Sequence, residues 1–255
     1  ISYYKHLKLT KIADKKHRKL ESEVFKNADI TLATSYTDAE NFRKKGANAF
    51  CITNGFDVDA STTLSMTEEN SKTLPLSNST TKFTLSYIGV LEQLRNPEIL
   101  WETLNDLVQE NADFKNDFQL KFVGRLDDKI LQKIESSPLK NNLTNLGYQT
   151  HDVALKHMQD STVLLITNFP QESSKGIIPG KIFEYLATGK TILSFGPKDA
   201  DVEKILNETK AGKHFGYDEK ENLKKFILES YENWKSGMLN QNAENIEQFS
   251  RKNLT

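Results

Sequence analysis

Residues 176–193 read GIIPGKIFEYLATGKTIL, in which a helix start, an amphipathic helix and an apolar strand follow one another directly. Pro179 suits the first position of a helix, because proline has no N–H group to leave unpaired there. The segment TILSFG at its end is apolar and short enough to be a buried strand. A helix followed at once by such a strand is typical of α/β proteins, whose parallel sheets are covered by helices on both faces.

The same alternation continues on both sides of this stretch. Several apolar runs are each followed by a longer amphipathic segment, and these runs are ITLATS, FTLSYIGV, FQLKFVG, LTNLGY and STVLLIT. The pattern predicts further helices over 36–45, 97–110, 127–135, 151–159 and 199–208. The tail over 219–255 is also helical in pattern, with Phe226, Tyr231 and Trp234 placed to pack on the sheet. We therefore predict an α/β fold with a mostly parallel sheet flanked by helices.

The composition is that of a soluble globular protein with little net charge. The 255 residues carry a formal charge of −1, which gives no global attraction to nucleic acid. No apolar run approaches the roughly 20 residues that a membrane span needs. The single cysteine, Cys51, cannot form an internal disulfide and lies in the run AFCI, where we expect a small buried hydrophobic side chain. These features predict a cytoplasmic protein.

One polar stretch interrupts the alternation. Residues 57–82 are rich in Ser, Thr and Asn and lack apolar periodicity, so we predict a surface loop between two structured blocks. The chain opens on Ile1 and on a charged helical pattern over 3–29, with no strand before it. This opening indicates a sequence entered midway.

The turn over 177–181 has the features of an anion site. Ligands of an open parallel sheet bind beyond the carboxyl ends of its strands, which is where this turn lies. Gly180 allows a ligand to approach the backbone, and the first N–H groups of the helix together with Lys181 would suit a diphosphate. The alternative is a proline-capped helix with a surface lysine, and this motif alone leaves both open.

Glu184 lies four residues after Gly180, and therefore on the same face of the helix. A diphosphate would repel the carboxylate, so its useful partners are neutral hydroxyls, which it can accept as a pair. The hydroxyls of a ribose fit this requirement. The alternative is a glutamate that only favours the first turn of its helix.

Two glycines that end predicted strands are followed by arginines. Arg95 comes shortly after Gly89, and Arg125 directly follows Gly124. An arginine offers several planar donors to a phosphate, and a tight glycine turn lets the ligand reach it. Each of these arginines alone is compatible with a solvated side chain instead.

A third glycine, Gly147, closes the run LTNLGY and precedes Tyr148, which stacks on a base or packs half-buried; we favour packing. His151, His157 and His214 lack the spacing of metal ligands. The sequence therefore predicts neither a metal site nor a bound cofactor.

Taken in order, five segments resemble the donor half of GT-B glycosyltransferases of the group-one type, also called family four; they are ITNGFD, YIGVLEQLRNPEIL, LKFVGR, LGYQTHDVALKHMQDSTVLLIT and IPGKIFEYLATGKTILSFGP. The resemblance covers roughly residues 28–216. It implies a Rossmann-like C-terminal domain of a GT-B fold, together with the end of the N-terminal domain. In such enzymes the acceptor binds mainly the first domain and a nucleotide sugar binds the second.

The resemblance divides the chain into three parts. Residues 1–57 match the end of the acceptor domain and the crossover to the second domain, 58–82 form the polar loop, and 83–255 match the nucleotide-sugar-binding domain. The rest of the acceptor domain is then missing, and we expect this chain alone to be inactive.

The resemblance also implies roles for individual residues. Glu184 matches the acid that holds the donor ribose, Arg95 takes the place of the basic residue that neutralises the diphosphate, and Gly89 matches the glycine beneath the phosphates. Two positions depart from the family: Val90 stands where many members carry an arginine, and Gly176 stands where an upstream glutamate is expected, with Glu172 further upstream. Lys181 is the expected substitute cation. The expected catalytic residues are Arg95 and Lys181, and the expected donor-binding residues are Gly89, Val90, Gly124, Arg125, Gly147, Tyr148, Ile178, Pro179, Gly180 and Glu184.

The implied function is transfer of a sugar from a nucleoside diphosphate sugar to a glycan or glycolipid acceptor, as in polysaccharide biosynthesis. Two alternatives are open: a nucleotide-sugar epimerase or phosphorylase of the same fold, and a non-catalytic module that binds a nucleotide or a partner. No nucleic acid partner is expected. The basic run KKHRK at 15–19 either contacts anionic lipid at the inner face of the cytoplasmic membrane or forms a solvated helix face.

Overall fold

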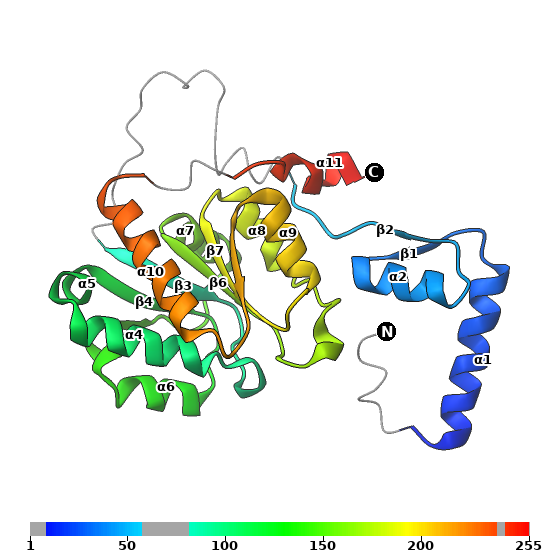
Figure 1. The fold of residues 1–255 in the computed structure, drawn as a ribbon, viewed down its shortest axis with the longest axis horizontal. Helices are drawn as coiled ribbons and strands as arrows, with labels where there is room; N and C mark the ends of the chain where they lie inside the picture. Colours follow the sequence, from blue (N-terminus) through cyan, green and yellow to red (C-terminus); the bar gives the residue numbers. More distant parts are fainter. Residues whose placement is uncertain (1–8, 58–81, 239–242, 255) are drawn as a thin grey trace.

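The computed structural model describes residues 9–57, 82–238 and 243–254. The predicted polar loop over 57–82 lies outside these ranges except for its first and last residues. Residues 3–8 of the helical pattern over 3–29 also lie outside them. The described chain forms a small N-terminal unit with a two-stranded sheet and a larger unit with a six-stranded sheet (Figure 1). The division into domains at 57 and 83 stays a prediction, although the larger sheet begins at Phe83.

The N-terminal unit consists of two helices and two parallel strands. In chain order they are α1 (Lys11–Asn27), β1 (Thr31–Ala33), α2 (Tyr36–Lys44) and β2 (Ala49–Cys51). The side chains of Thr10 and Ser35 accept hydrogen bonds from N–H groups of the first turns of α1 and α2, as N-caps do. Its core is small: the rings of Phe25 and Phe42 lie 5.1 Å apart and pack against two alanines of the unit.

The larger sheet is entirely parallel and has the strand order β5-β4-β3-β6-β7-β8. This is the order of a doubly wound Rossmann-like sheet, which grows outward from its middle in two directions. The direction of growth reverses between β3 and β6. The strands are β3 (Phe83–Ile88), β4 (Phe118–Val123), β5 (Leu143–Asn145), β6 (Val163–Thr167), β7 (Thr191–Phe195) and β8 (Gly212–Phe215).

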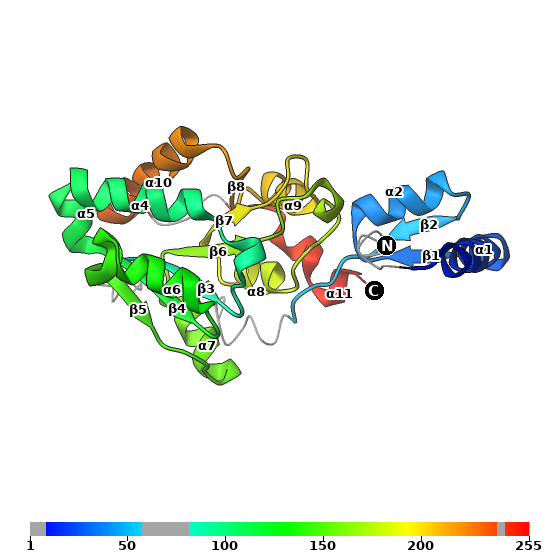
Figure 2. The same cartoon turned by 90° about the horizontal axis from the view of Figure 1, so that it is seen from below.

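Helices cover both faces of this sheet, as the alternation of apolar runs and helical segments predicts (Figure 2). One face packs on α4 (Glu98–Glu110), α5 (Ala112–Asp117), α6 (Asp128–Glu135) and α10 (Lys220–Lys235). The other packs on α7 (His151–Gln159), α8 (Lys181–Ala187) and α9 (Asp201–Thr209). Short helical turns complete the described chain: η3 (Gln93–Arg95), η4 (Pro138–Asn142), η5 (Glu172–Ser174), η6 (Ile246–Phe249) and α11 (Arg251–Leu254).

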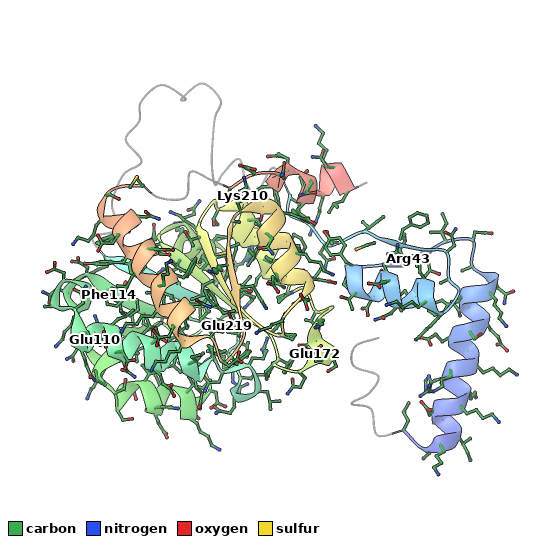
Figure 3. The ribbon with its side chains drawn as sticks, viewed as in Figure 1. Arg43, Glu110, Phe114, Glu172, Lys210 and Glu219 are labelled. Atoms are coloured by element: carbon green, nitrogen blue, oxygen red, sulfur yellow. The ribbon has the colours of Figure 1, made fainter. Side chains whose placement is uncertain are left out.

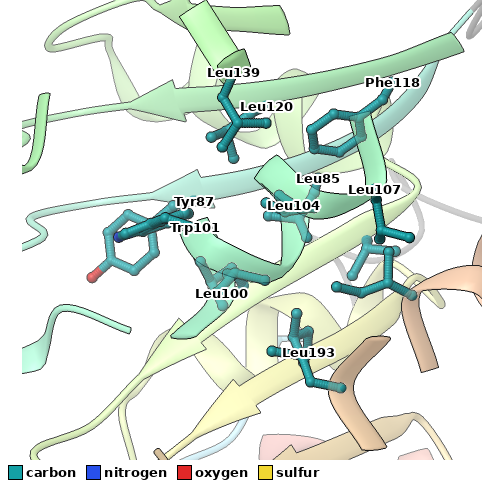
Figure 4. Packing of buried hydrophobic residues seen from close by; sticks show 14 of the residues in the cluster. Leu85, Tyr87, Leu100, Trp101, Leu104, Leu107, Phe118, Leu120, Leu139 and Leu193 are labelled. Carbon is teal, nitrogen blue, oxygen red and sulfur yellow. The ribbon is translucent and has the colours of Figure 1, made fainter. Parts of the chain in front are cut away.

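The core on the α4 side is rich in aromatic rings. Phe83 of β3 lies 5.6 Å from the Tyr231 ring and 6.1 Å from the Trp234 ring, both from α10. Phe226 packs on Phe215 of β8, so the predicted packing of the tail on the sheet is confirmed. Leucines from β3, β4 and α4 fill the space between the rings (Figure 4).

The start of α8 corrects one local prediction. Pro179 is not the first helical residue, because Gly180 is the N-cap and the helix begins at Lys181. The Ile182 N–H donates to the Pro179 carbonyl at 3.0 Å, so the chain enters the helix through a tight turn over residues 179–182. The sequence pattern also missed α5 and β8, which are short and carry polar residues.

The two units are joined by polar contacts at α2 and along the crossover. Asp201, which is fully buried at the start of α9, accepts hydrogen bonds from the N–H and the hydroxyl of Thr37, both at 2.8 Å. The Phe56 N–H donates to the Phe249 carbonyl at 3.1 Å, and the Arg251 N–H donates back to Phe56 at 2.9 Å. The segment after β2 is therefore held by the returning C-terminal segment.

Candidate nucleotide site

The carboxyl ends of β3 and β6 mark the point where the strand order reverses, and ligands of doubly wound sheets bind in the crevice there. Gly89, Val90 and Arg95 follow β3, and Phe169 follows β6. Lys181 arrives from α8, and its Nζ donates to the Ile88 carbonyl at 2.7 Å. The structure therefore brings Gly89, Val90, Arg95 and Lys181 together at the switch point.

Positive φ angles and close neighbours explain two of the predicted glycines. Gly89 has a φ of +127°, and a Cβ added there would lie 2.6 Å from the Lys181 Nζ. A Cβ on Gly124, whose φ is +119°, would lie 2.2 Å from the Gly89 carbonyl oxygen. The positive φ favours glycine at both positions, and a side chain at Gly124 would also collide with the backbone of Gly89.

Lys181 is partly buried, and its ammonium lies against β3 instead of projecting into solvent. Its Nζ is 4.5 Å from the centre of the Tyr87 ring. Burial lowers the pKa of Lys181 to about 8; the nearby charge of Arg95 lowers it as well, and Glu184 opposes both. The interpretation as an ordinary surface lysine is wrong.

Arg95 is also held at the site, because its side chain is only 22% exposed. Its Nη2 donates to the Val90 carbonyl at 2.9 Å and lies 3.4 Å from the Glu92 carboxylate. The guanidinium stands 5.6 Å from the centre of the Phe169 ring. Its Nε is buried and has no hydrogen-bond partner among the residues that the structure describes. The solvated alternative for Arg95 is therefore wrong.

Glu184 and Gly180, which lie on either side of Lys181 in the sequence, line a cavity of about 600 Å³. The cavity lies between α7, α8, α11 and the crossover segment ITNGFD, which contributes residues 52–57. His151 at the start of α7 also lines it. Sequence reasoning placed Glu184 on the ligand side of its helix but did not assign His151 or the crossover to the site, because only the tertiary fold brings these segments together.

The remaining predicted residues lie around this centre. The Gly124 N–H donates to the Gly147 carbonyl at 2.7 Å, which aligns the ends of β4 and β5. Arg125 is exposed, and Tyr148 is 88% exposed, so the interpretation of Tyr148 as half-buried packing is wrong. Ile178 packs on the core of the α8 face, and Pro179 lies partly buried before the helix. Whether these residues contact a ligand stays a prediction.

Gly176 shows why an upstream glutamate is missing there. A Cβ at this position would lie 3.1 Å from the Ser35 Oγ and 3.2 Å from the Thr37 Cβ, so α2 of the N-terminal unit occupies the space. Glu172 is exposed, pairs with Lys175 at 2.8 Å and lies on the side that faces α2 (Figure 3). Neither position places a carboxylate beside the two cations.

Two aromatic residues at the site, Tyr87 and Phe169, were not assigned from the sequence. Each presents its ring to one cation, Tyr87 to Lys181 and Phe169 to Arg95. The only signal in the sequence is their place at a strand end, since Tyr87 lies near the end of β3 and Phe169 just after β6.

Cys51 and the metal-ligating residue types add little to this site. Cys51 was expected to be buried and is partly exposed, and its partial burial raises the pKa of the thiol to about 11. Within the described ranges, no group of three His, Cys, Asp or Glu side chains could hold a metal ion. No helix of those ranges is long and apolar enough to cross a membrane.

Solved structures similar to this one include glycosyltransferases. HepE of Anabaena in complex with UDP superposes with a TM-score of 0.71 at 17% identity, over 95% of this chain and 65% of its own. A mutant of S. aureus TarM in complex with fondaparinux, alpha-GlcNAc-glycerol and UDP gives 0.64 at 16% identity, over 97% and 46%. The fold is of the GT-B type.

A glycosyltransferase of Rickettsia africae shares the GT-B fold as well, with a TM-score of 0.67 at 14% identity over 96% of this chain. The chain spans less than two thirds of the length of each of these structures. The sequence itself matches no protein-family model and no curated protein. At these identities the likeness extends to the fold, and the predicted Rossmann-like C-terminal half of a GT-B protein is confirmed at that level.

Proposed function

We propose that this chain carries the donor site of a glycosyltransferase, which transfers a sugar from a nucleoside diphosphate sugar to a glycan or lipid-linked acceptor. The observation that carries the proposal is the pair of cations at the switch point. Lys181 and Arg95 lie beneath and beside Gly89, where a doubly wound sheet binds its ligand. The UDP in the HepE and TarM structures supports the choice of a nucleoside diphosphate.

In this proposal the two cations stabilise the charge that develops on the leaving diphosphate. Breaking the bond between sugar and phosphate places negative charge on the phosphate oxygens, and cations fixed beforehand stabilise that charge without reorganising. Arg95 offers its guanidinium N–H groups, and Lys181 offers an ammonium with further protons to donate. No bound cofactor is part of this scheme.

Glu184 would select the ribose. Its carboxylate borders the 600 Å³ cavity and can accept hydrogen bonds from two neighbouring hydroxyls. We expect Glu184→Gln to weaken binding of the ribonucleotide and to leave binding of the 2′,3′-dideoxy nucleotide unchanged. Equal weakening for both nucleotides would contradict a role at the ribose.

The acceptor side of the proposal extends to the membrane surface. The basic run KKHRK lies on α1, whose Ile12, Leu20 and Val24 are 83%, 48% and 59% exposed. Apolar side chains among lysines on one helix suit an anionic lipid surface. The test is co-sedimentation with lipid vesicles. We expect the wild type to bind phosphatidylserine vesicles but not phosphatidylcholine vesicles, and the double variant Lys15→Glu/Lys16→Glu to bind neither. Equal binding of the wild type and the double variant would contradict this contact.

The experiment that tests the donor site is a calorimetric and thermal-shift titration with UDP, GDP, ADP and CMP. Binding to the folded state raises its apparent stability, so a selective ligand raises the melting temperature. We expect one nucleoside diphosphate to bind and Arg95→Ala to abolish most of its effect. Lys225→Ala, an exposed lysine on α10 with 77% side-chain exposure, is the matched control. Binding that Arg95→Ala does not change would overturn the assignment of the site.

Turnover separates this proposal from a non-catalytic nucleotide-binding module. A chain that also carries a complete acceptor domain, given the nucleotide sugar whose diphosphate binds, should release that diphosphate only when acceptor is present. Tight binding without release would favour the module.

A further inference from the structure

Tyr87 is unusual because its ring lies in the hydrophobic core while its hydroxyl lies at the carboxyl end of β3, where the ligand is expected. It is the residue before the last in β3, is 2% exposed, and belongs to the cluster that β3 shares with α4. Its hydroxyl points away from the centre of the cluster (Figure 4). Phenylalanine would fill the same volume without a polar atom to satisfy.

The hydroxyl of Tyr87 is linked to Arg95 through a shared carbonyl, and its ring contacts Lys181. The hydroxyl donates to the Val90 carbonyl at 2.8 Å, and the same carbonyl accepts from the Arg95 Nη2 at 2.9 Å. A carbonyl oxygen has two lone pairs, so it can accept both bonds at once. The ring meanwhile faces the Lys181 ammonium, whose Nζ is 4.5 Å from its centre.

These contacts matter because the two cations repel each other. The positive charge of Arg95 adds to the effect of burial and further lowers the pKa of Lys181. A side chain left to itself would turn away from a like charge. Here the Ile88 and Val90 carbonyls hold one cation each, and Tyr87 fixes Val90 and lies against Lys181.

We propose that Tyr87 is a positioning residue that holds Lys181 and Arg95 in a single arrangement matched to the two phosphates of the donor. The ring holds the ammonium by attraction to its negative face, and the hydroxyl fixes the carbonyl that orients the guanidinium. This inference rests on the proposed function. The residue acts through both cations and does not itself contact the ligand, since its side chain is almost wholly buried.

Two substitutions separate the ring from the hydroxyl. Tyr87→Phe keeps the ring and removes the hydroxyl that bonds the Val90 carbonyl, whereas Tyr87→Leu removes both ring and hydroxyl. Tyr231→Phe is the matched control, because Tyr231 is fully buried in the same cluster. Its hydroxyl donates at 2.7 Å to Asp117, the last residue of α5, which directly precedes the amino end of β4. Thermal melting of all three variants shows whether each one folds.

The first readout is the affinity for UDP, GDP and ADP compared with the corresponding monophosphates. Tyr87→Phe should weaken binding of the diphosphate about fivefold, the size expected when one hydrogen bond is lost, and should change the monophosphate less. Tyr231→Phe should lower the melting temperature and leave both affinities unchanged. A Tyr87→Phe protein that binds the diphosphate as the wild type does would overturn the inference and leave the proposed function standing.

The second readout is the pH profile of diphosphate binding, which a purely structural role would not shift. The charged or polar groups that face the Lys181 Nζ are Arg95 from η3, Glu184 from its own helix, the Ile88 carbonyl and the Tyr87 ring. Loss of the ring in Tyr87→Leu should move the alkaline loss of binding to lower pH, and Tyr87→Phe should keep the wild-type midpoint. Identical midpoints in the two variants would contradict the part assigned to the ring.

The two hypotheses fail in different ways. If the wild-type chain binds none of the three nucleoside diphosphates, the proposed function fails, and the role of Tyr87 fails with it. If the wild type binds one of them and Arg95→Ala or Lys181→Met weakens that binding while Tyr87→Phe and Tyr87→Leu do not, only the role of Tyr87 is wrong.

Discussion

The two sheets of this protein differ in how completely they are covered. The six-stranded sheet has an apolar core on each face, and its strands β3 and β6 are buried along their whole length. Within the described ranges, the two-stranded sheet of the N-terminal unit is covered on the side of α2 only. Its other face carries Ile30, Leu32, Phe50 and Ile52, which are 58%, 59%, 52% and 40% exposed.

This difference indicates where the order of each unit comes from. Two strands alone are marginal in water, so the N-terminal unit depends on contacts with the larger one. The larger unit has enough buried area to fold around its own core and to hold two like charges at the switch point. The extent of the core therefore explains both observations: the six-stranded sheet is rigid where the ligand is expected, and the N-terminal unit depends on its contacts with the larger unit.

The largest expected effect is in the core of the six-stranded sheet. Phe83→Ala removes a fully buried ring that touches Phe114, Phe118, Tyr231 and Trp234, and it should lower the free energy of unfolding by about 3–5 kcal/mol. Phe25→Ala, in the small core of the other unit, should leave the main denaturant transition in place and increase hydrogen exchange only over α1, α2 and the strands between them. A loss of similar size in both variants would show that the two units unfold as one.

The second effect is a dependence of stability on pH that arises from Lys181. Its pKa is about 8 in the folded protein and is near its ordinary value of 10.5 when unfolded, so below pH 8 the charged form costs folding free energy in full. Between about pH 8 and pH 10.5 the folded state releases this proton first, and stability should rise with pH. Lys181→Met should therefore be more stable than wild type at pH 7, by on the order of 3 kcal/mol at most, with the difference shrinking towards pH 10. Equal urea midpoints at pH 7, or a difference that grows with pH, would contradict the assigned pKa.

The third effect concerns the link between the units. Asp201→Asn removes the charge that accepts two hydrogen bonds from Thr37, and it should destabilise the docking of α2 by about 1–3 kcal/mol. Hydrogen exchange should rise over α2 and β1–β2, while β3 and β6 keep their protection. Lys204, which lies 3.1 Å from the same carboxylate and is half-exposed, offers a control: Lys204→Ala should leave exchange in α2 unchanged. Increased exchange in the core strands of Asp201→Asn would place Asp201 in the larger fold instead.

The smallest effect is expected on the exposed face of the two-stranded sheet. Leu32→Ser and Phe50→Ser remove apolar side chains that are more than half exposed, so the free energy of unfolding of this chain should change by no more than about 0.5 kcal/mol. The measurement is a urea titration of each variant. A loss of several kcal/mol would mean that this face is covered in solution.

Much of the fold could be predicted from the sequence, because its strands and helices are continuous apolar runs and amphipathic segments. The run FTLSYIGV became β3, and residues 151–159 became α7 with the predicted bounds. The strand GKHF was missed because Gly212 and Lys213 interrupt any apolar run, and its pairing with β7 is what makes it a strand. The start of α8 was misplaced by two residues, since a proline can precede a tight turn as well as begin a helix.

The candidate site could be predicted only in its residue types. Glycines, Arg95, Lys181 and Glu184 are visible as a sequence pattern, and the fold brings them to one end of the sheet. The burial of Lys181, the exposure of Tyr148 and the support of the cations by Tyr87 and Phe169 depend on contacts between segments far apart in the chain. A side chain at Gly176 would have no room because the start of α2 packs there, and no local pattern near residue 176 could indicate this contact.

The central claim is that Lys181 and Arg95 together bind the diphosphate of a nucleotide. The most direct test is to measure, by calorimetry at pH 7, the ratio of affinities for a nucleoside diphosphate and its monophosphate in wild type and in Lys181→Met. We predict that the wild type strongly favours the diphosphate and that Lys181→Met, although folded and more stable, loses most of this preference. An unchanged preference in Lys181→Met would contradict the account, because the cation at the centre of the site would then play no part in binding the diphosphate.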